Sequence, residues 1–400
     1  MTEFRNWVGN QTCTPERILA PASEAEVQAA VRVARAVRCV ATGHSFTPIH
    51  LTEGTLLTMD RLLGVLRVDP VTGRATALSG TPVGDFGEPL WAAGFSLENQ
   101  GDIDTQGIAG AMATATHGSG LELPSFSAWL RRARLVTASG DVVEIGEDDP
   151  RLPAVQVAVG MLGVMTEVEV TTVPAYRMSE RIEHWSWEEV HGRFDELSRA
   201  HRHFSFFWCP SEASGALYGL TAPPGSRIAD SCYVKIYDAV GDDVPDSAVP
   251  DARVGRSYTI YPVVFEPNFH ELEYFVPYER GPEAIAAMRE LMLARQPLAV
   301  FPMEVRTVAA DAGWLSHSYE RASVVISVSG QPGTDYEPYL REVDALLGAF
   351  DARVHWGKLH YLTREQLLER YPRAADFIAL RRELDPDGVF LNDHLRPLFA

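Results

Sequence analysis

The segment from Asn99 to Gly120 constrains the fold of this chain more than any other. Its sequence, NQGDIDTQGIAGAMATATHGSG, contains five glycines separated by small residues and hydroxyl-bearing side chains. A backbone of this composition can approach a ligand closely and present unpaired N–H groups to it, as in loops that hold phosphate. The two common nucleotide-binding patterns, G-x-G-x-x-G after the first strand and G-x-x-x-x-G-K-[ST], are both missing. A nucleotide would therefore have to bind by another scheme.

Two further small-residue turns stand on either side of this segment. ATGHSF, residues 41–46, follows the apolar run VRCV, and GMLGVMTEV, residues 160–168, leads into an alternating strand. One glycine-rich loop is most often only a loop, but three of them in the first part of the chain indicate one extended ligand that crosses several loops.

Hydrophobic periodicity and chain length predict two domains. Residues 1–175 have the pattern of a mixed α/β unit, with a capped helix after Pro21 and hairpins in residues 65–80 and 132–146. From residue 176 aromatic side chains become dense, strand-like runs such as ELEYFVP appear, and a pair of amphipathic helices follows near the end. A chain of 400 residues exceeds the roughly 250 to 300 residues that one core usually supports.

Charge and composition exclude several partners. The formal net charge of -19, from 54 acidic and 35 basic residues, repels phosphate backbones and anionic lipid, so neither nucleic acid nor a membrane is expected as a partner. The first residues lack a signal-peptide pattern and no later run is apolar for long enough to span a membrane, which predicts a cytoplasmic protein. The four cysteines form no C-x-x-C pair, so we expect no metal site and no disulfide framework.

The order of motifs resembles one family of flavoproteins. ATGHSF, IAGAMATATHGSG, GMLGVMTEV, EVRT, HWGK and DPDGVFLND occur in the order typical of the vanillyl-alcohol-oxidase (VAO) type. Within it the chain is most similar, over essentially its whole length, to the sugar-lactone and alditol oxidases. The resemblance implies an α+β, two-domain FAD-binding fold of the VAO/PCMH type. It divides the chain into an FAD-binding domain (1–175), a substrate or cap domain built on a large antiparallel sheet (176–360), and a C-terminal segment that returns to the FAD domain (361–400).

The resemblance also implies how FAD is held. In this branch the histidine of the G-H-S turn, here His44, is commonly joined covalently to the 8α-methyl group of the flavin; the simpler alternative is a turn histidine that bonds to its own loop. His117 corresponds to a histidine on the pyrophosphate side, with a binding or packing role. The residues implied to bind FAD are Ala41, Thr42, Gly43, His44, Ser45, Phe46, Gly101, Asp102, Gly107, Gly110, Ala113, Thr114, Thr116, His117, Gly118, Gly160, Gly163, Val164, Asn392 and His394.

Glu304 and Arg306 are the first candidates for catalysis. They stand one residue apart in FPMEVRTVAA, so a strand places both side chains on one face. Spacing alone favours a solvated ion pair. The resemblance instead implies that Glu304 contacts or deprotonates a substrate hydroxyl and that Arg306 orients substrate oxygens.

Lys358, Asp102 and Gly101 complete the expected site. Lys358 follows a predicted strand that carries His355 and Trp356; by itself it reads as an exposed lysine, whereas the resemblance places it near flavin N1 or the substrate hydroxyl. Asp102 stands where alditol oxidases have a small hydroxyl residue, and an acid there fits the lactone oxidases better. Gly101 stands where a larger side chain would keep oxygen from the flavin, which favours an oxidase.

ELEYFVP, residues 271–277, also resembles the lactone branch, which makes Glu273 and Tyr274 either supports of the site from the second domain or packing residues of its sheet. The resemblance therefore predicts an FAD-dependent oxidase of a sugar 1,4-lactone of the gulono, arabinono or galactono type. A hydride passes from an alcohol carbon to flavin N5, and molecular oxygen is then reduced to hydrogen peroxide. The alternatives are an alditol oxidase acting on xylitol or sorbitol, and a lactone dehydrogenase that uses a cytochrome or a quinone. A non-catalytic relative is disfavoured because His44, Glu304, Arg306 and Lys358 are all present.

Overall fold

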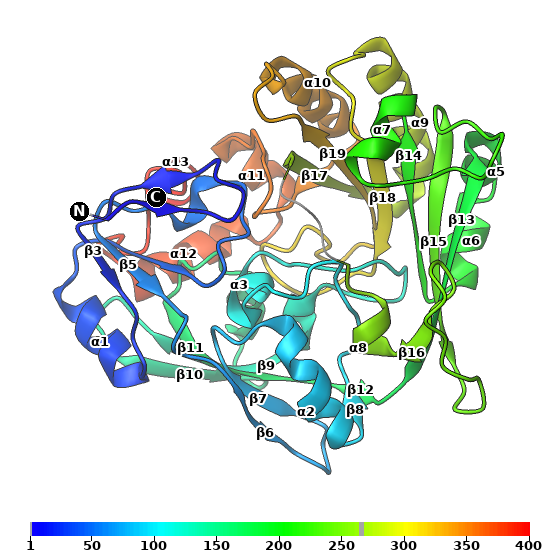
Figure 1. Ribbon diagram of the computed structural model, residues 1–400. Coiled ribbons are helices and arrows are strands. Elements are labelled where there is room, and N and C mark those ends of the chain that lie inside the picture. The colour runs from blue at the N-terminus through cyan, green and yellow to red at the C-terminus, as the bar shows by residue number, and fades with distance from the viewer. Residues whose placement is uncertain (1, 264–267) are drawn as a thin grey trace.

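The computed structural model describes residues 2–263 and 268–400 of the chain (Figure 1). A three-stranded parallel sheet, in the order β3-β5-β4, forms the first layer. Helix α1 (Glu24–Val33) connects β3 to β4 along the chain. It begins as the sequence predicts, since the Ser23 hydroxyl accepts a hydrogen bond from the Glu26 N–H. Val27 and Val31 on its buried face pack into the core between helix and sheet. The three strands are β3 (Arg17–Leu19), β4 (Val37–Val40) and β5 (Thr55–Thr58).

A five-stranded antiparallel sheet lies beside this layer, in the order β10-β9-β11-β7-β6. Both predicted hairpins are confirmed as the pairs β6–β7 and β9–β10, and β11 pairs with a strand of each hairpin and so joins them. Two short two-stranded ribbons, β1–β2 and β8–β12, complete this half. The strands are β1 (Phe4–Arg5), β2 (Thr12–Cys13), β6 (Val65–Val68), β7 (Ala75–Leu78), β8 (Phe95–Ser96), β9 (Leu130–Val136), β10 (Val142–Gly146), β11 (Val164–Val170) and β12 (Val173–Pro174).

The second half is built on an eight-stranded sheet in which every neighbouring pair is antiparallel, in the order β16-β13-β15-β14-β18-β19-β17-β20. Helices α5, α6, α9 and α10 pack against this sheet on the side away from the N-terminal half (Figure 1). The predicted cap sheet is therefore present. Its strands are β13 (Arg177–Ser186), β14 (His203–Cys209), β15 (Ser231–Val240), β16 (Val254–Arg256), β17 (His270–Pro277), β18 (Met303–Val308), β19 (Ser323–Gly330) and β20 (Arg353–Val354).

The end of the chain lies against its beginning. Helices α11 to α13 lie beside the N-terminal strands in Figure 1, and the Val37 N–H donates to the Val389 carbonyl over 2.8 Å. The α-helices after α1 are α2 (Gly87–Ala92), α3 (Ile108–Ala113), α4 (Leu152–Gln156), α5 (Trp187–Gly192), α6 (Phe194–Ala200), α7 (Glu212–Leu217), α8 (Ser257–Ile260), α9 (Gly281–Ala294), α10 (Glu337–Gly348), α11 (Arg364–Arg370), α12 (Ala374–Leu384) and α13 (Arg396–Phe399). The 3₁₀ turns are η1 (Pro48–His50), η2 (Val83–Phe86), η3 (Phe126–Trp129) and η4 (Tyr278–Arg280).

One predicted strand is wrong at its end. The run expected to continue through His355 and Trp356 stops at Val354. The chain turns there because the His355 ring Nδ1 accepts a hydrogen bond from the Gly357 N–H and the His355 carbonyl accepts one from the Lys358 N–H. Strand alternation therefore does not apply to these residues, and His355 and Lys358 both line the polar cavity described below.

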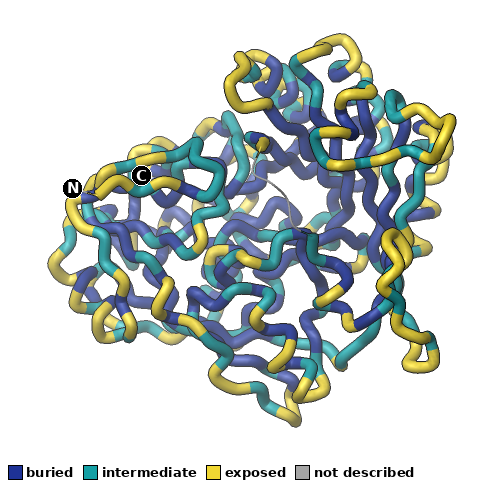
Figure 2. Tube along the Cα trace, in the orientation of Figure 1, coloured by how far each residue is buried: buried dark blue, intermediate teal, exposed yellow. Residues whose placement is uncertain are grey.

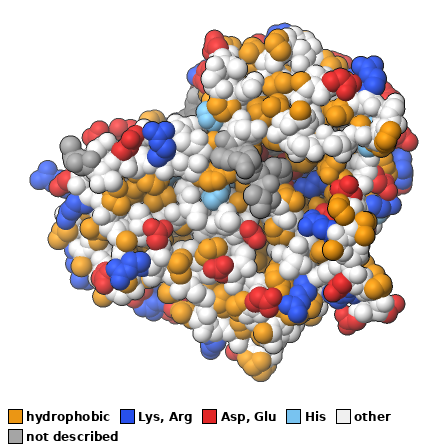
Figure 3. Space-filling model, in the orientation of Figure 1, with side chains coloured by type: hydrophobic (Ala, Val, Ile, Leu, Met, Phe, Trp, Pro, Cys, Tyr) orange, Lys and Arg blue, Asp and Glu red, His pale blue; other side chains and the backbone are white. Residues whose placement is uncertain are grey.

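Burial follows the sheets and the interior between the two halves, whereas exposed residues gather on outer loops and helices (Figure 2). On the face shown in Figure 3, acidic and basic side chains are interspersed, so no patch of one sign dominates that face. Among the described residues, none of the helices combines the length and apolar character needed to cross a membrane. All four cysteines are free, as the absence of a disulfide framework in the sequence predicts.

Candidate active site

The three small-residue segments meet around one cavity, which we call the loop cavity. It encloses about 1090 Å³, the open solvent at its mouth included, and residues of all three segments line it. Space for an elongated ligand is therefore present where the sequence predicts it. The predicted cofactor residues that line it are Ala41, Thr42, Gly43, His44, Ser45, Gly107, Gly110, Ala113, Thr114, Thr116, Gly160, Gly163 and Val164.

Two of these glycines are required by local geometry. A Cβ at Gly107 would lie 2.5 Å from the Cβ of Ala41, so a side chain would force the first and second segments apart. Gly43 has a φ of +68°, in the left-handed region that other residues rarely adopt. The narrow spacing of the loops, which keeps backbone groups on the cavity wall, therefore depends on glycine.

Four predicted cofactor residues line neither this cavity nor the one described below. Phe46 is buried against Trp7, and a Cβ at Gly118 would lie only 1.9 Å from the Gln100 carbonyl oxygen. The Asn392 amide donates to the carbonyls of Pro48 and Leu51, and His394 packs against the ring of His360. Phe46, Gly118, Asn392 and His394 therefore lie outside the lining of both cavities.

His44 projects from the first turn between polar and aromatic groups. Its Nδ1 lies 2.8 Å from the Thr42 hydroxyl and its Nε2 lies 3.4 Å from the Thr105 hydroxyl. The Trp7 ring stacks on the imidazole at a centroid distance of 4.8 Å. Burial, with the positive charge of Lys358 as a smaller cause, lowers the His44 pKa to about 4. The ring is therefore neutral at neutral pH and keeps a lone pair that can attack an electrophilic carbon.

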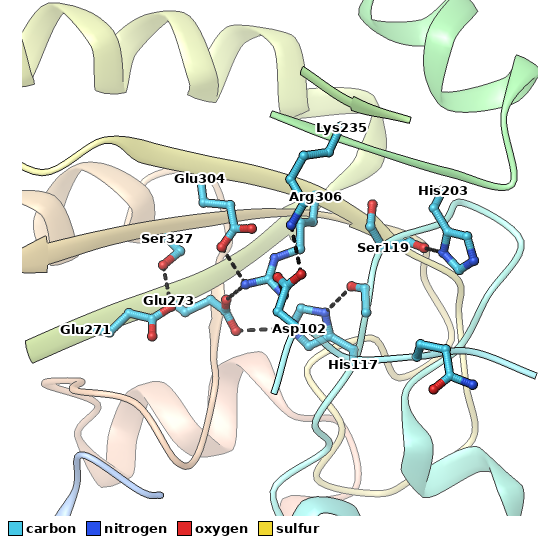
Figure 4. A network of polar contacts seen from close by, with 12 residues as sticks. Asp102, His117, Ser119, His203, Lys235, Glu271, Glu273, Glu304, Arg306 and Ser327 are labelled. Atoms are coloured by element: carbon cyan, nitrogen blue, oxygen red, sulfur yellow. Dashed lines mark hydrogen bonds and ion pairs between the residues drawn. The ribbon is translucent and has the colours of Figure 1, made fainter. Parts of the chain in front are cut away.

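A second cavity, which we call the polar cavity, adjoins the first and encloses about 640 Å³ with the open solvent at its mouth included. Ionisable side chains from loop and sheet surround it (Figure 4). Four residues line both cavities, so the two ligand spaces meet there: Gln106, Thr116, His355 and Lys358.

The pairing of the large sheet builds one wall of the polar cavity. Glu304 on β18 is opposite Ser327 on β19, which is opposite Glu273 on β17, so these three side chains form one row on the same face. Arg306, two residues along β18, lies on the same face beside this row, and its Nη2 donates to Glu304 Oε2 over 2.6 Å. The prediction that Glu304 and Arg306 share a face is confirmed, and both are buried.

Three carboxylates surround the Arg306 guanidinium (Figure 4). Besides the contact with Glu304, its nitrogens lie 3.6 Å from Asp102 Oδ2 and 3.5 Å from Glu273 Oε2. Burial raises the Glu304 pKa to about 7, although the charge of Arg306 acts in the opposite direction. At neutral pH this carboxyl group can therefore either accept or release a proton.

Asp102 has a partner that sequence reasoning missed. Lys235, on β15, donates from Nζ to Asp102 Oδ1 over 2.8 Å, and both side chains are buried. Although burial opposes ionisation, Lys235 and Arg306 lower the Asp102 pKa. Asp102 is therefore a fixed carboxylate in the wall of the polar cavity.

His117 lines the polar cavity and not the loop cavity. Its Nδ1 lies 2.7 Å from the Gly118 carbonyl and its Nε2 lies 3.0 Å from Glu273 Oε1. Although burial opposes it, the charges of His117 and Arg306 hold the Glu273 pKa well below its usual range. An ionised Glu273 and a carbonyl both accept hydrogen bonds, so each ring nitrogen of His117 faces an acceptor.

His117, Glu273 and His355 bring their ligand atoms within 4.8 Å of one another, close enough to suggest a metal site. Their hydrogen bonds argue against one. His355 Nδ1 accepts from the Gly357 N–H, which in the neutral ring leaves the proton on Nε2, the nitrogen that faces Glu273. With His117 donating to Glu273 as well, the donor atoms are already used within the protein.

Lys358 and Gly101 lie in the wall of the polar cavity, where the sequence predicts a site. The Lys358 ammonium forms an ion pair with Glu271 and lies 4.9 Å from the centre of the Phe46 ring. Its side chain is 18 % exposed, so it is partly buried, as a role in the site requires. Glu271 was signalled only by its position two residues before Glu273 in the alternating ELEYFVP run, whereas Tyr274 of the same run packs in the core.

Comparison with known proteins identifies the family. Residues 15–146 match the family described as FAD binding domain, and residues 223–398 match that described as D-arabinono-1,4-lactone oxidase. A protein of Mycobacterium tuberculosis named L-gulono-1,4-lactone dehydrogenase is 36% identical over 427 residues, which cover 98% of each chain. The chain belongs to the FAD-dependent sugar-lactone oxidoreductase family. As a member, it is a flavoenzyme of the class that oxidises alcohol groups.

Other members of the family show the range of named activities. An alditol oxidase of Streptomyces is 29% identical over 417 residues, covering 99% of each chain, and an L-gulonolactone oxidase of Scyliorhinus torazame is 27% identical over 438 residues, covering 99% of this chain and 98% of the relative. A solved structure of cholesterol oxidase from B. sterolicum superimposes with a TM-score of 0.82 at 15% identity, covering 100% of this chain and 96% of that one. These neighbours confirm the VAO/PCMH-type fold that the sequence predicts.

Proposed function

We propose that the protein oxidises a sugar 1,4-lactone, with FAD in the loop cavity, the lactone in the polar cavity and molecular oxygen as the final acceptor. The proposal assigns FAD to residues 1–175 together with 361–400, and the substrate to residues 176–360. Bound FAD supplies the two-electron acceptor for the hydride. The observation that carries the proposal is the buried Glu304–Arg306 pair in a cavity that adjoins the loop cavity along shared wall residues.

Each charged group of the polar cavity has a role in this proposal. Glu304, whose pKa of about 7 suits a general base, accepts the proton of the substrate hydroxyl as the hydride leaves carbon. Arg306 donates to a substrate oxygen and fixes the orientation of the lactone. Lys358, where the two cavities meet, supplies positive charge beside the group that becomes negative on reduction.

His44 is proposed to form the covalent link to the flavin. A neutral imidazole in the loop cavity, oriented by Thr42 and Thr105 and covered by Trp7, has the nucleophilic form that such a bond needs. Denaturing gel electrophoresis tests this directly, because a covalently held flavin stays with the polypeptide and fluoresces under ultraviolet light.

Asp102 favours a lactone over an open-chain alditol. Its carboxylate is held by Lys235 and Arg306, so it offers fixed acceptor oxygens to hydroxyl groups on one side of the cavity. Comparing kcat/KM for lactones of gulono, galactono and arabinono configuration with kcat/KM for xylitol and sorbitol tests the proposal. Equal or faster turnover of the alditols would make an open-chain alditol, and not a lactone, the favoured substrate.

Two observations bear on the electron acceptor. Gly101 lines the polar cavity without a side chain that could shield the flavin, which favours reaction with oxygen. The relative from Mycobacterium tuberculosis is named a dehydrogenase, so a lactone dehydrogenase is the second candidate. Reducing the enzyme with substrate under argon and then admitting air separates the two, because an oxidase regains its oxidised spectrum rapidly and forms hydrogen peroxide.

A further inference from the structure

Arg38 is a buried cation in the wall of the loop cavity that the proposed chemistry does not use. It stands on β4, just before the first glycine turn. No carboxylate among residues 2–263 and 268–400 forms an ion pair with it. Its donors are directed instead to four backbone carbonyls: Ile49 at 2.6 Å, Val159 at 2.8 Å, Gly160 at 3.1 Å and Phe390 at 2.6 Å.

These carbonyls solvate the guanidinium but do not cancel its charge. Burial lowers the Arg38 pKa to about 10, so the group is still protonated at neutral pH. The ionisable neighbours of Arg38, in contrast, are uncharged at neutral pH. Burial, followed by the charge of Arg38, lowers the pKa of His50 and of His394 to about 4, and burial raises the pKa of the Cys39 thiol to about 12. The cavity wall thus holds a net positive charge that lacks a counter-charge in these surroundings, and an isolated buried charge is costly.

The four carbonyls belong to three separate parts of the fold. Ile49 lies in η1 just after the first glycine turn, Val159 and Gly160 begin the third small-residue segment, and Phe390 belongs to the C-terminal segment. Arg38 therefore connects two walls of the loop cavity with the segment that closes the N-terminal half. A ligand that interacts with the charge of Arg38 therefore interacts with the side chain that connects these three parts of the fold.

We propose that Arg38 is the counter-charge for the anionic diphosphate of the cofactor. The inference rests on the proposed placement of FAD in the loop cavity. It assigns the retention of an anion to one buried charge in addition to the backbone N–H groups of the glycine loops. An anionic ligand is attracted by this charge, whereas a neutral ligand of similar shape is not.

The test compares charged and neutral ligands on the full chain. His44→Ala, which removes the proposed covalent link, is freed of flavin by dialysis against concentrated bromide and titrated calorimetrically with ADP and with adenosine. Adding Arg38→Met is expected to weaken ADP binding by about tenfold or more while adenosine binding changes by less than about twofold, because only ADP carries the diphosphate.

Arg353→Met in the same background is the matched control. Arg353 is also buried, also has a pKa lowered to about 10, chiefly by burial, and also donates to backbone carbonyls, those of Arg370 and Tyr319, but it does not line the loop cavity. Arg353→Met is expected to lower thermal stability without a selective loss of affinity for ADP. If Arg38→Met leaves ADP affinity unchanged, or weakens ADP and adenosine equally, the inference is wrong.

A further variant covers the case in which Arg38→Met does not fold. Arg38→Lys keeps the charge but cannot reach four carbonyls, so it is expected to retain ADP binding within about threefold while Tm falls. Loss of ADP binding from a folded Arg38→Lys protein would contradict the role of charge. Failure of the proposed function has a different signature, because His44→Ala with Arg38 intact would then bind neither ADP nor FAD.

Discussion

Replacing Glu304 with glutamine tests the buried carboxyl group through stability as well as through activity. Glutamine has nearly the same size and cannot ionise, so Glu304→Gln removes the titration and preserves most of the packing. The native pKa of about 7 lies above the ordinary value of 4.5 because burial disfavours the charged form. The native state therefore holds this proton more tightly than the unfolded chain does.

The sign and size of the effect follow from that difference. Protonated Glu304 contributes stability that is fully present below about pH 4.5 and is lost as the pH rises through about 7. At about 1.4 kcal/mol for each pH unit between the two pKa values, the loss is on the order of 3 kcal/mol. The side chain is only 10% exposed, so solvent screening reduces this figure little.

Urea unfolding followed by tryptophan fluorescence, from about pH 5 to about pH 8, measures this loss as the difference between the natural protein and Glu304→Gln. Between about pH 5 and about pH 8, the free energy of unfolding of Glu304→Gln is expected to rise by a few kcal/mol relative to that of the natural protein. Glu273→Gln is the matched control. The pKa of Glu273 is well below its usual range, so its contribution is already complete near pH 5 and the difference from the natural protein stays constant above that pH.

If the difference in free energy of unfolding between Glu304→Gln and the natural protein also stayed constant with pH, the buried carboxyl group with a raised pKa would be refuted.

The same pKa makes a kinetic prediction, since a base with a pKa of about 7 is active only when ionised. The value of kcat/KM should rise with pH up to about 7 and then level off, and Glu304→Gln should lower kcat by about a hundredfold or more. A variant that keeps normal kcat would remove Glu304 from the role of base.

Four further substitutions test the remaining assignments. His44→Ala should abolish the fluorescent flavin band on a denaturing gel, and a persistent band would assign the link to another residue. Lys358→Met should lower kcat by about tenfold to a hundredfold in stopped-flow reduction, and unchanged reduction would exclude a role beside the flavin. Gly101→Val should slow reoxidation by air with little change in reduction by substrate, and equal rates of reoxidation would remove Gly101 as the determinant. Lys235→Met should raise KM for lactones at least about tenfold, because it leaves Asp102 with one cationic neighbour fewer, and an unchanged KM would make the ion pair purely structural.

Sequence reasoning succeeded where the determining contacts are local. The turn TASGD between β9 and β10 carries its own hairpin signal, and the spacing of Glu304 and Arg306 sets their common face once a strand is assumed. The glycine turns predicted a shared cavity because several such turns rarely occur in order without a common ligand. The family resemblance then added the roles that spacing alone leaves open.

The rest depends on contacts between distant segments. Lys235 and its partner Asp102 are 133 residues apart, and no local pattern marks a lysine inside β15 as a partner for a loop acid. The predicted strand through His355 was wrong because one ring nitrogen accepts a backbone N–H and turns the chain, a choice that hydrophobic periodicity does not record. The direction of the His117 ring likewise depends on a distant residue, since its Nε2 lies 3.0 Å from Glu273 on β17.

The bond between Arg38 and the Phe390 carbonyl also sets an order of events during synthesis. The two residues are 352 positions apart, so at roughly 5 to 20 residues per second the ribosome adds Phe390 about twenty to seventy seconds after Arg38. Through that interval β4 and the first glycine turn exist without the segment that later closes over them. The loop cavity can therefore take its final form only after translation has passed residue 390.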